Sequence, residues 1–145
     1  MRALRLSVVL LSFVAGVVTV PIGPASAEDV LIGFRTPSGN INCQYASDSN
    51  GTFLRCDLLA NDAPIPRRPT DCDLDYGNAF EMTPRGRAGR ICVGDTTASP
   101  DNSILDYAMT WKRGGFTCTS ALAGLTCKNQ AKRGFFLSRK AQRLF

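Results

Sequence analysis

The chain has 145 residues, a net charge of +5, six cysteines and no histidine. The absence of histidine excludes Ser–His–Asp and Cys–His catalytic devices and zinc sites that need histidine ligands. An even number of cysteines in a chain of this length is typical of an exported protein stapled by disulfides.

The first 27 residues have the three parts of a secretory signal peptide. Two arginines lie near the start, an apolar stretch runs from residue 6 to residue 20, and Ala25-Ser26-Ala27 follows as a small-x-small cleavage signal. An uncleaved anchor helix is the alternative, but Pro21 and Pro24 end the apolar stretch before it reaches the roughly 20 residues that a membrane span needs. We therefore predict a secreted or envelope-associated protein, without a transmembrane segment in its mature form. Residues 28–145 are expected to form one disulfide-rich β domain.

The mature part is punctuated by glycine and proline, and it shows no sustained helical period. Short alternating or β-branched runs between turn residues predict an all-β fold, a small antiparallel sandwich or barrel built from hairpins. Residues 61–69 contain three prolines and are expected to form an extended crossing, not a strand. A short helix is an option over residues 103–108 or in the tail after Ser138. The expected strands are residues 30–35, 41–46, 53–58, 78–83, 89–93, 107–113, 116–119, 125–129 and 134–138.

All six cysteines lie after the predicted cleavage point, so we predict three disulfides. Sequence alone does not choose among the possible pairings, but turn chemistry favours nearest neighbours. Asn50-Gly51, a strong hairpin signal, separates the first two cysteines, and a glycine-containing turn separates the last two. The middle pair follows by elimination. The expected disulfides are Cys43–Cys56, Cys72–Cys92 and Cys118–Cys127.

Charge is distributed unevenly along the chain. Residues 28–106 hold twelve acids and seven bases, whereas residues 107–145 hold eight bases and no acid. This basic C-terminal hairpin and tail predict binding to an anionic envelope polymer or lipid surface, and the interspersed Phe135, Phe136, Leu144 and Phe145 suit an interfacial anchor. The alternative is a solvated face that complements the acidic part of the same domain, and no nucleic-acid partner is expected. The predicted anion-binding residues are Lys128, Lys132, Arg133, Arg139, Lys140 and Arg143.

The carboxylates support weaker hypotheses. Aspartates alternate from residue 71 to residue 75, but Gly77 and Glu81 each lie one residue away from the EF-hand positions, so we predict no metal site and no cofactor. A small secreted hydrolase that uses carboxylates such as Asp73 or Glu81 is the alternative to a non-catalytic role. An inhibitor-type module that binds an extracellular protein is a third hypothesis.

Two aromatic residues near the start of the basic segment belong to one predicted strand. Tyr107 and Trp111 are expected on one face of that strand because their positions differ by an even number. Core packing is the first interpretation, and an aromatic platform for a sugar or a peptide is the second.

Several motifs resemble one known family. Phe34-Arg35-Thr36-Pro37-Ser38-Gly39-Asn40-Ile41-Asn42-Cys43 is similar to the opening signature of a family of small exported bacterial proteins, common in actinobacteria, that is classed as a domain of unknown function. Gly114-Gly115-Phe116-Thr117-Cys118 and Gly124-Leu125-Thr126-Cys127-Lys128-Asn129 are similar to later motifs. Lys132-Arg133-Gly134-Phe135 stands where the family often carries Gly-His-Gly-Phe. The resemblance implies a secreted, cysteine-stapled β domain, and it implies no activity.

Overall fold

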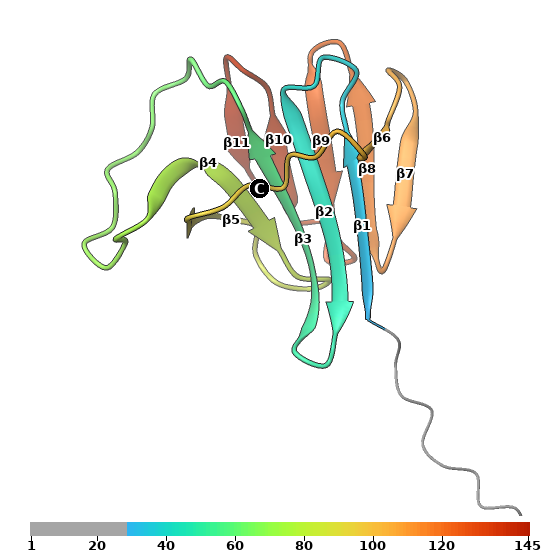
Figure 1. The fold of residues 1–145 in the computed structure, drawn as a ribbon, viewed down its shortest axis with the longest axis horizontal. Coiled ribbons are helices and arrows are strands. Elements are labelled where there is room, and N and C mark those ends of the chain that lie inside the picture. The colour runs from blue at the N-terminus through green and yellow to red at the C-terminus, as the bar shows by residue number, and fades with distance from the viewer. Residues whose placement is uncertain (1–28) are drawn as a thin grey trace, which may run out of the picture.

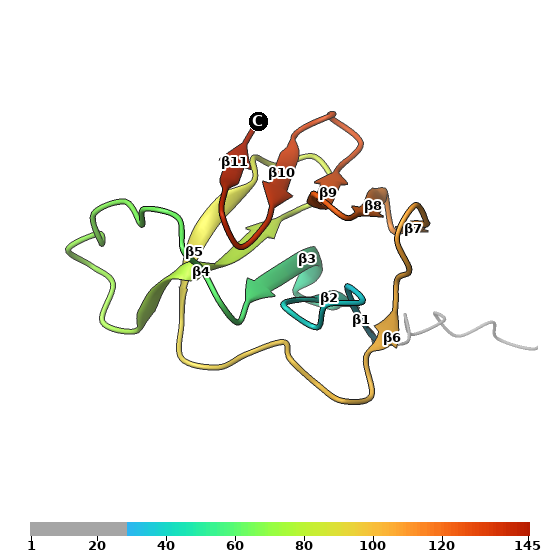
Figure 2. The same ribbon diagram turned by 90° about the horizontal axis from the view of Figure 1, so that it is seen from above.

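The computed structural model describes residues 29–145, so the predicted signal peptide lies outside the described residues. The described part of the chain contains eleven strands and no helix, arranged as two sheets that face each other (Figures 1 and 2). The prediction of an all-β fold is confirmed, and two separate sheets make it a sandwich. The strands are β1 (Val30–Arg35), β2 (Ile41–Asp48), β3 (Gly51–Leu58), β4 (Asp75–Met82), β5 (Gly89–Val93), β6 (Ser103–Ile104), β7 (Thr110–Arg113), β8 (Phe116–Ala121), β9 (Gly124–Lys128), β10 (Gly134–Leu137) and β11 (Gln142–Leu144).

Sheet A has the strand order β5-β4-β3-β2-β1-β6 and is antiparallel except for the parallel pair β1 and β6. Its central hairpin turns at Ser49-Asn50, with Asp48 and Gly51 paired across the turn, one residue before the Asn-Gly pair that gave the turn signal. Asp48 holds that turn, because its carboxylate accepts hydrogen bonds from the main-chain N–H groups of Asn50 and Gly51. The segment from residue 59 to residue 74 contains no strand, as its three prolines predict.

Sheet B has the order β11-β10-β9-β8-β7 and is a meander of neighbouring antiparallel strands. The two sheets follow one another in the sequence, because sheet A ends with β6 and sheet B begins with β7. The segment 105–109 is therefore the direct connection between them. Figure 2 shows this connection at one side of the sandwich.

The core contains two similar rows of side chains, one from each sheet. Strand register places Phe34, Cys43, Cys56 and Phe80 side by side across sheet A. The corresponding row of sheet B contains Trp111, Cys118, Cys127 and Phe135. Aromatic contacts close both ends of this arrangement, since the ring centroids of Phe34 and Trp111 lie 4.9 Å apart and those of Phe80 and Phe135 lie 6.1 Å apart. Two disulfides thus lie between two pairs of aromatic rings in the centre of the sandwich.

All three predicted disulfides are confirmed. Cys43–Cys56 and Cys118–Cys127 each join residues that lie directly opposite in neighbouring strands, with 4.0 Å between the Cα atoms. Cys72–Cys92 connects the segment before β4 to β5, with a Cα–Cα distance of 5.8 Å. No free cysteine remains among the described residues.

The two suggested short helices are wrong. Residues 103 and 104 form β6, and residues 142–144 form β11. Both strands are very short, and each forms only beside a partner strand. The partner of β6 is β1, which is distant in sequence, and the partner of β11 is β10, which precedes it across a turn. Strands of this length carry no detectable period of their own, so their pairing is decided by tertiary structure.

Candidate functional site

The outer face of sheet B carries hydroxyl, cationic and aromatic side chains. On this face, one row of cross-strand neighbours consists of Thr110, Thr119, Thr126, Phe136 and Arg143. A parallel row contains Lys112, Thr117 and Lys128, followed by Gly134 and Phe145, which exchange two main-chain hydrogen bonds. The side chains of the two rows include three basic groups and no acidic group.

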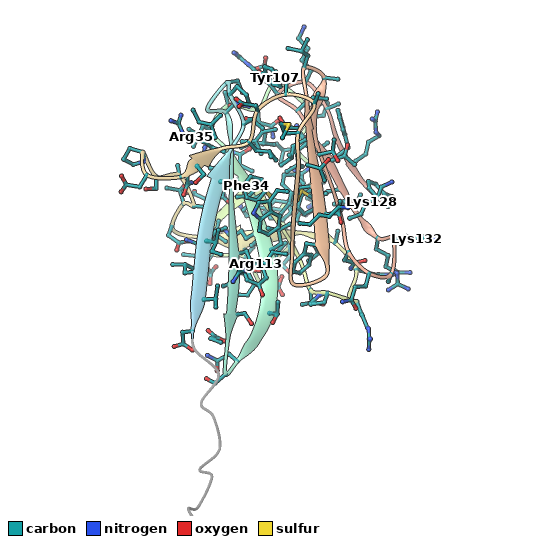
Figure 3. The ribbon with its side chains drawn as sticks, turned by 90° about the vertical axis from the view of Figure 1, so that its right-hand side faces the viewer. Phe34, Arg35, Tyr107, Arg113, Lys128 and Lys132 are labelled. Carbon is teal, nitrogen blue, oxygen red and sulfur yellow. A yellow bond between two sulfur atoms is a disulfide. The ribbon has the colours of Figure 1, made fainter. Side chains whose placement is uncertain are left out.

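The turns at the adjoining end of the sandwich carry further bases. Figure 3 shows Lys128 and Lys132 on the outer side of sheet B, with Arg113 nearer to the edge between the sheets. Each of the seven bases in this region has an exposed side chain. We call this group the basic end: Arg85, Arg87, Lys112, Arg113, Lys128, Lys132 and Arg133.

Asn129 fastens the β9–β10 turn to the β4–β5 turn. Its side-chain nitrogen donates to the main-chain oxygens of Thr83 (2.9 Å) and Gly86 (2.7 Å). Its side-chain oxygen accepts from the N–H groups of Ala131 and Arg133, which closes its own turn. Asn129 is buried, so these bonds are shielded from water and hold the bases of the two turns next to each other.

The structure separates the six predicted anion-binding residues into three places. Lys128, Lys132 and Arg133 belong to the basic end, and Arg143 lies on the outer face of sheet B with its guanidinium 4.4 Å from the centre of the Phe136 ring. Arg139 and Lys140 lie in the β10–β11 turn, at the other end of the strands. Arg139 forms an ion pair of 2.8 Å with Asp62.

Four members of the basic end, Arg85, Arg87, Lys112 and Arg113, were not among the predicted site residues. Arg85 and Arg87 belong to the acid-rich part of the sequence, and the contact between the two turns brings them to the basic end. Phe135, which we predicted as part of an interfacial anchor, is fully buried in the core. Its neighbour Phe136 is half-buried on the outer face, whereas Leu144 and Phe145 are exposed.

Few of the bases are neutralised by the acidic part of the protein. Among residues 29–145 the ion pairs are Arg55–Asp57, Arg55–Asp95 and Arg139–Asp62. Within the described part of the chain, no residue of the basic end has a carboxylate within ion-pairing distance. Direct complementation of the acidic part of the molecule, the alternative explanation for the basic segment, is therefore limited to Arg139.

Asp57 and Asp95 form ion pairs with Arg55 on the outer face of sheet A. These contacts hold residues 94–102, which we call the strap, against the sheet. Asp57, almost fully buried, receives two hydrogen bonds from Arg55, both of 2.9 Å, and a third from the main-chain N–H of Thr97. Arg55 also bonds to the Asp95 carboxylate, and this hydrogen bond lowers the pKa of Asp95. Every oxygen of Asp57 is occupied, so this cluster is suited to holding the strap.

The carboxylates of the hydrolase hypothesis do not form a pair. Asp73 is exposed in the segment before β4, whereas Glu81 lies near the far end of β4, next to Arg55 across the strand pair. Even Asp75 is about 20 Å from Glu81 at the usual rise per residue, and the two carboxylates of a glycosidase lie roughly 5–10 Å apart. Burial raises the pKa of Glu81, because desolvation outweighs the nearby positive charge.

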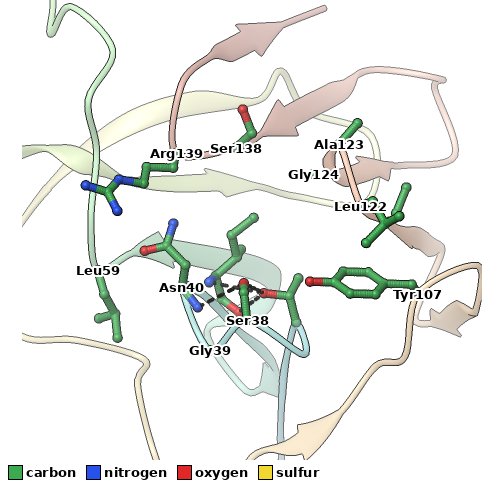
Figure 4. A pocket seen from close by; sticks show the side chains of 13 residues that line it. Ser38, Gly39, Asn40, Leu59, Tyr107, Leu122, Ala123, Gly124, Ser138 and Arg139 are labelled. Atoms are coloured by element: carbon green, nitrogen blue, oxygen red, sulfur yellow. Dashed lines mark hydrogen bonds between the residues drawn. The ribbon is translucent and has the colours of Figure 1, made fainter.

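A cavity lies at the end of the sandwich opposite the basic end (Figure 4). It has a volume of about 500 Å³, and the turns after β1, β8 and β10 line it together with Leu59 and Tyr107. Figure 4 shows the Tyr107 hydroxyl directed toward Ser38. Tyr107 and Trp111 therefore separate: Trp111 packs between Phe34 and Tyr45 in the core, and Tyr107 lies before the strand to which we assigned it.

These observations define a disulfide-stapled β-sandwich with an acid-free basic end. The chain belongs to a family of unknown function, DUF6636, whose model matches residues 10–145. This agrees with the resemblance seen in the sequence to a domain of unknown function. No curated protein and no solved structure matches the chain significantly. A search of residues 29–145 for a helix with the length and apolar character of a membrane span finds none.

Proposed function

We propose that this protein is an exported, non-catalytic binding domain that attaches to an anionic component of the cell envelope through its basic end. The observation that carries this proposal is the set of seven exposed bases with no carboxylate within ion-pairing distance in the described part of the chain. Unpaired cations on one surface produce a positive field that attracts polyanions and anionic surfaces. The three disulfides are consistent with a secreted protein.

Co-sedimentation of the oxidised protein with isolated cell envelopes tests the proposal. We expect the protein to pellet at low salt and to be released at about 1 M salt, where the Debye length falls to about 3 Å. Reversal of three charges in Lys128→Glu, Lys132→Glu, Arg133→Glu is expected to abolish pelleting.

A matched control reverses three exposed charges outside the basic end. The variant Arg67→Glu, Arg68→Glu, Lys140→Glu has the same net charge as the test variant, and we expect it to pellet like the wild-type protein. Equal loss in both variants would reduce the effect to net charge alone. Pelleting that survives reversal at the basic end would contradict the proposed surface.

A further inference from the structure

A cavity opens at the edge of the sandwich where β5 and β11 lie. It has a volume of about 380 Å³ and is lined by Arg87 and Ala88 from sheet A and by Arg133, Leu144 and Phe145 from sheet B. The cavity therefore combines two guanidinium groups of the basic end with an apolar wall.

The apolar wall is exposed to solvent although the side chains are large. Leu144 is 47% exposed and Phe145 is 48% exposed. Two main-chain hydrogen bonds with Gly134, of 2.8 and 3.0 Å, continue the sheet beyond β11 and keep Phe145 at the rim. Half-exposed Leu and Phe side chains gain free energy when a ligand covers them, and a purely hydrophilic polymer does not supply that cover.

Three cationic side chains lie at this wall. Arg87 and Arg133 belong to the lining, and the ammonium group of Lys128 lies 5.9 Å from the centre of the Phe145 ring. Arg90, at the end of the core row of sheet A, packs its guanidinium 4.6 Å from the Phe80 ring centre and has no carboxylate partner within the described residues. Glu81 is adjacent to Phe80 in β4, but its side chain lies on the outer face of sheet A, opposite to the face that carries Phe80 and Arg90.

We propose that the β5–β11 cavity binds an anionic phospholipid, with the phosphate between Arg87 and Arg133 and the acyl chain against Ala88, Leu144 and Phe145. The inference rests on the proposed function and deepens it, since it selects a lipid among the anionic envelope components. Guanidinium groups bind phosphate through paired hydrogen bonds, and interfacial binding combines such charges with buried apolar area.

Vesicle co-sedimentation with the oxidised protein tests this site. We expect binding to vesicles of phosphatidylglycerol and phosphatidylcholine and no binding to phosphatidylcholine alone. The double variant Leu144→Ser, Phe145→Ser should lower the vesicle partition coefficient by roughly tenfold or more, while its binding to soluble inorganic polyphosphate stays unchanged. Leu122→Ser removes a leucine that is 86% exposed at the other end of the molecule, and it should bind vesicles like the wild-type protein.

The outcomes separate the lipid site from the general proposal. Unchanged vesicle binding in the Leu144/Phe145 variant overturns the cavity proposal. The cavity proposal is also overturned if the wild-type protein pellets with envelopes but does not bind vesicles that contain phosphatidylglycerol. In both cases, attachment through the basic end still stands. Failure of the wild-type protein to bind vesicles, polyphosphate and envelopes at low salt overturns both proposals.

Discussion

Replacing Arg55 by methionine should strongly destabilise the protein, because Arg55 neutralises a buried carboxylate. The side chains of Arg55 and Asp57 are only 11% and 7% exposed. Methionine keeps much of the apolar bulk of arginine but leaves the Asp57 charge with a single remaining donor, the N–H of Thr97. Removing one partner of a buried ion pair typically costs about 3–5 kcal/mol, a large share of the about 5–15 kcal/mol that stabilises an ordinary domain.

Two other substitutions on the same face provide the comparison. Asp57→Asn removes the buried charge, keeps an acceptor for Thr97 and leaves Arg55 paired with Asp95, so we expect a loss of about 1–3 kcal/mol. Arg35→Met also removes a guanidinium that holds the strap, but Arg35 donates only to the neutral main-chain oxygen of Asn102. That loss should stay near 1 kcal/mol.

Urea unfolding at neutral pH, followed by the fluorescence of the single tryptophan, measures all three variants. Trp111 is a suitable probe because it packs between the two sheets and lies far from the substituted positions in sequence. The midpoint should fall most for Arg55→Met while the slope stays constant. A cost below 1 kcal/mol, or one equal to that of Arg35→Met, would refute the idea that an orphaned charge determines the effect.

Three further predictions concern titration, reduction and backbone packing. The pKa of Glu81 is raised in the folded state, so the stability of the protein falls as the pH rises through that pKa. Glu81→Gln should therefore stabilise the protein at pH 7. Urea midpoints should show that this advantage disappears below about pH 4, where the wild-type carboxyl group is protonated as well. A mild thiol reductant without denaturant should reduce Cys72–Cys92 before the two fully buried disulfides, because the attacking thiolate must reach a sulfur atom. Alkylation followed by mass spectrometry measures the order of reduction. Simultaneous reduction of all three disulfides would contradict this prediction. Gly134→Ala should disrupt the β9–β10 pair, because a Cβ atom there would overlap the main-chain oxygen of Cys127, whereas Gly89→Ala has free space and should leave the thermal midpoint nearly unchanged.

Most of the fold was predictable because its strands are separated by local turn chemistry. The Asn-Gly signal at residues 50–51 and the glycines of the later hairpins act within a few residues. Because they lie at or next to the midpoints between the cysteines, they indicated that Cys43 faces Cys56 and Cys118 faces Cys127. β6 and β11 were not predictable in this way, because each is a short segment that becomes a strand only beside its partner.

The basic surface was predictable only in part, for a similar reason. Lys128, Lys132 and Arg133 are close in sequence, and the structure also keeps them close. Arg85 joins them through contacts between turns more than forty residues apart, which no local pattern encodes. Arg139 leaves the group because the chain brings Asp62 to it from 77 residues away. The runs of basic residues in the sequence therefore predicted that the surface is positively charged better than they predicted which residues form it.

The positions of the disulfides and of the chain connection between the sheets allow two molecules to exchange whole sheets. Two of the three disulfides join neighbouring strands of one sheet, the third joins β5 to the segment before β4, and no disulfide within the described residues crosses between the sheets. Sheet A and sheet B are also consecutive in the chain and are joined by the short segment 105–109. Two molecules can therefore exchange their C-terminal sheets without breaking a covalent bond, and each would rebuild the same interior from the partner's half. We expect such intertwined dimers to form on refolding at high protein concentration; gel filtration would distinguish them from monomers, whereas denaturing non-reducing electrophoresis would not.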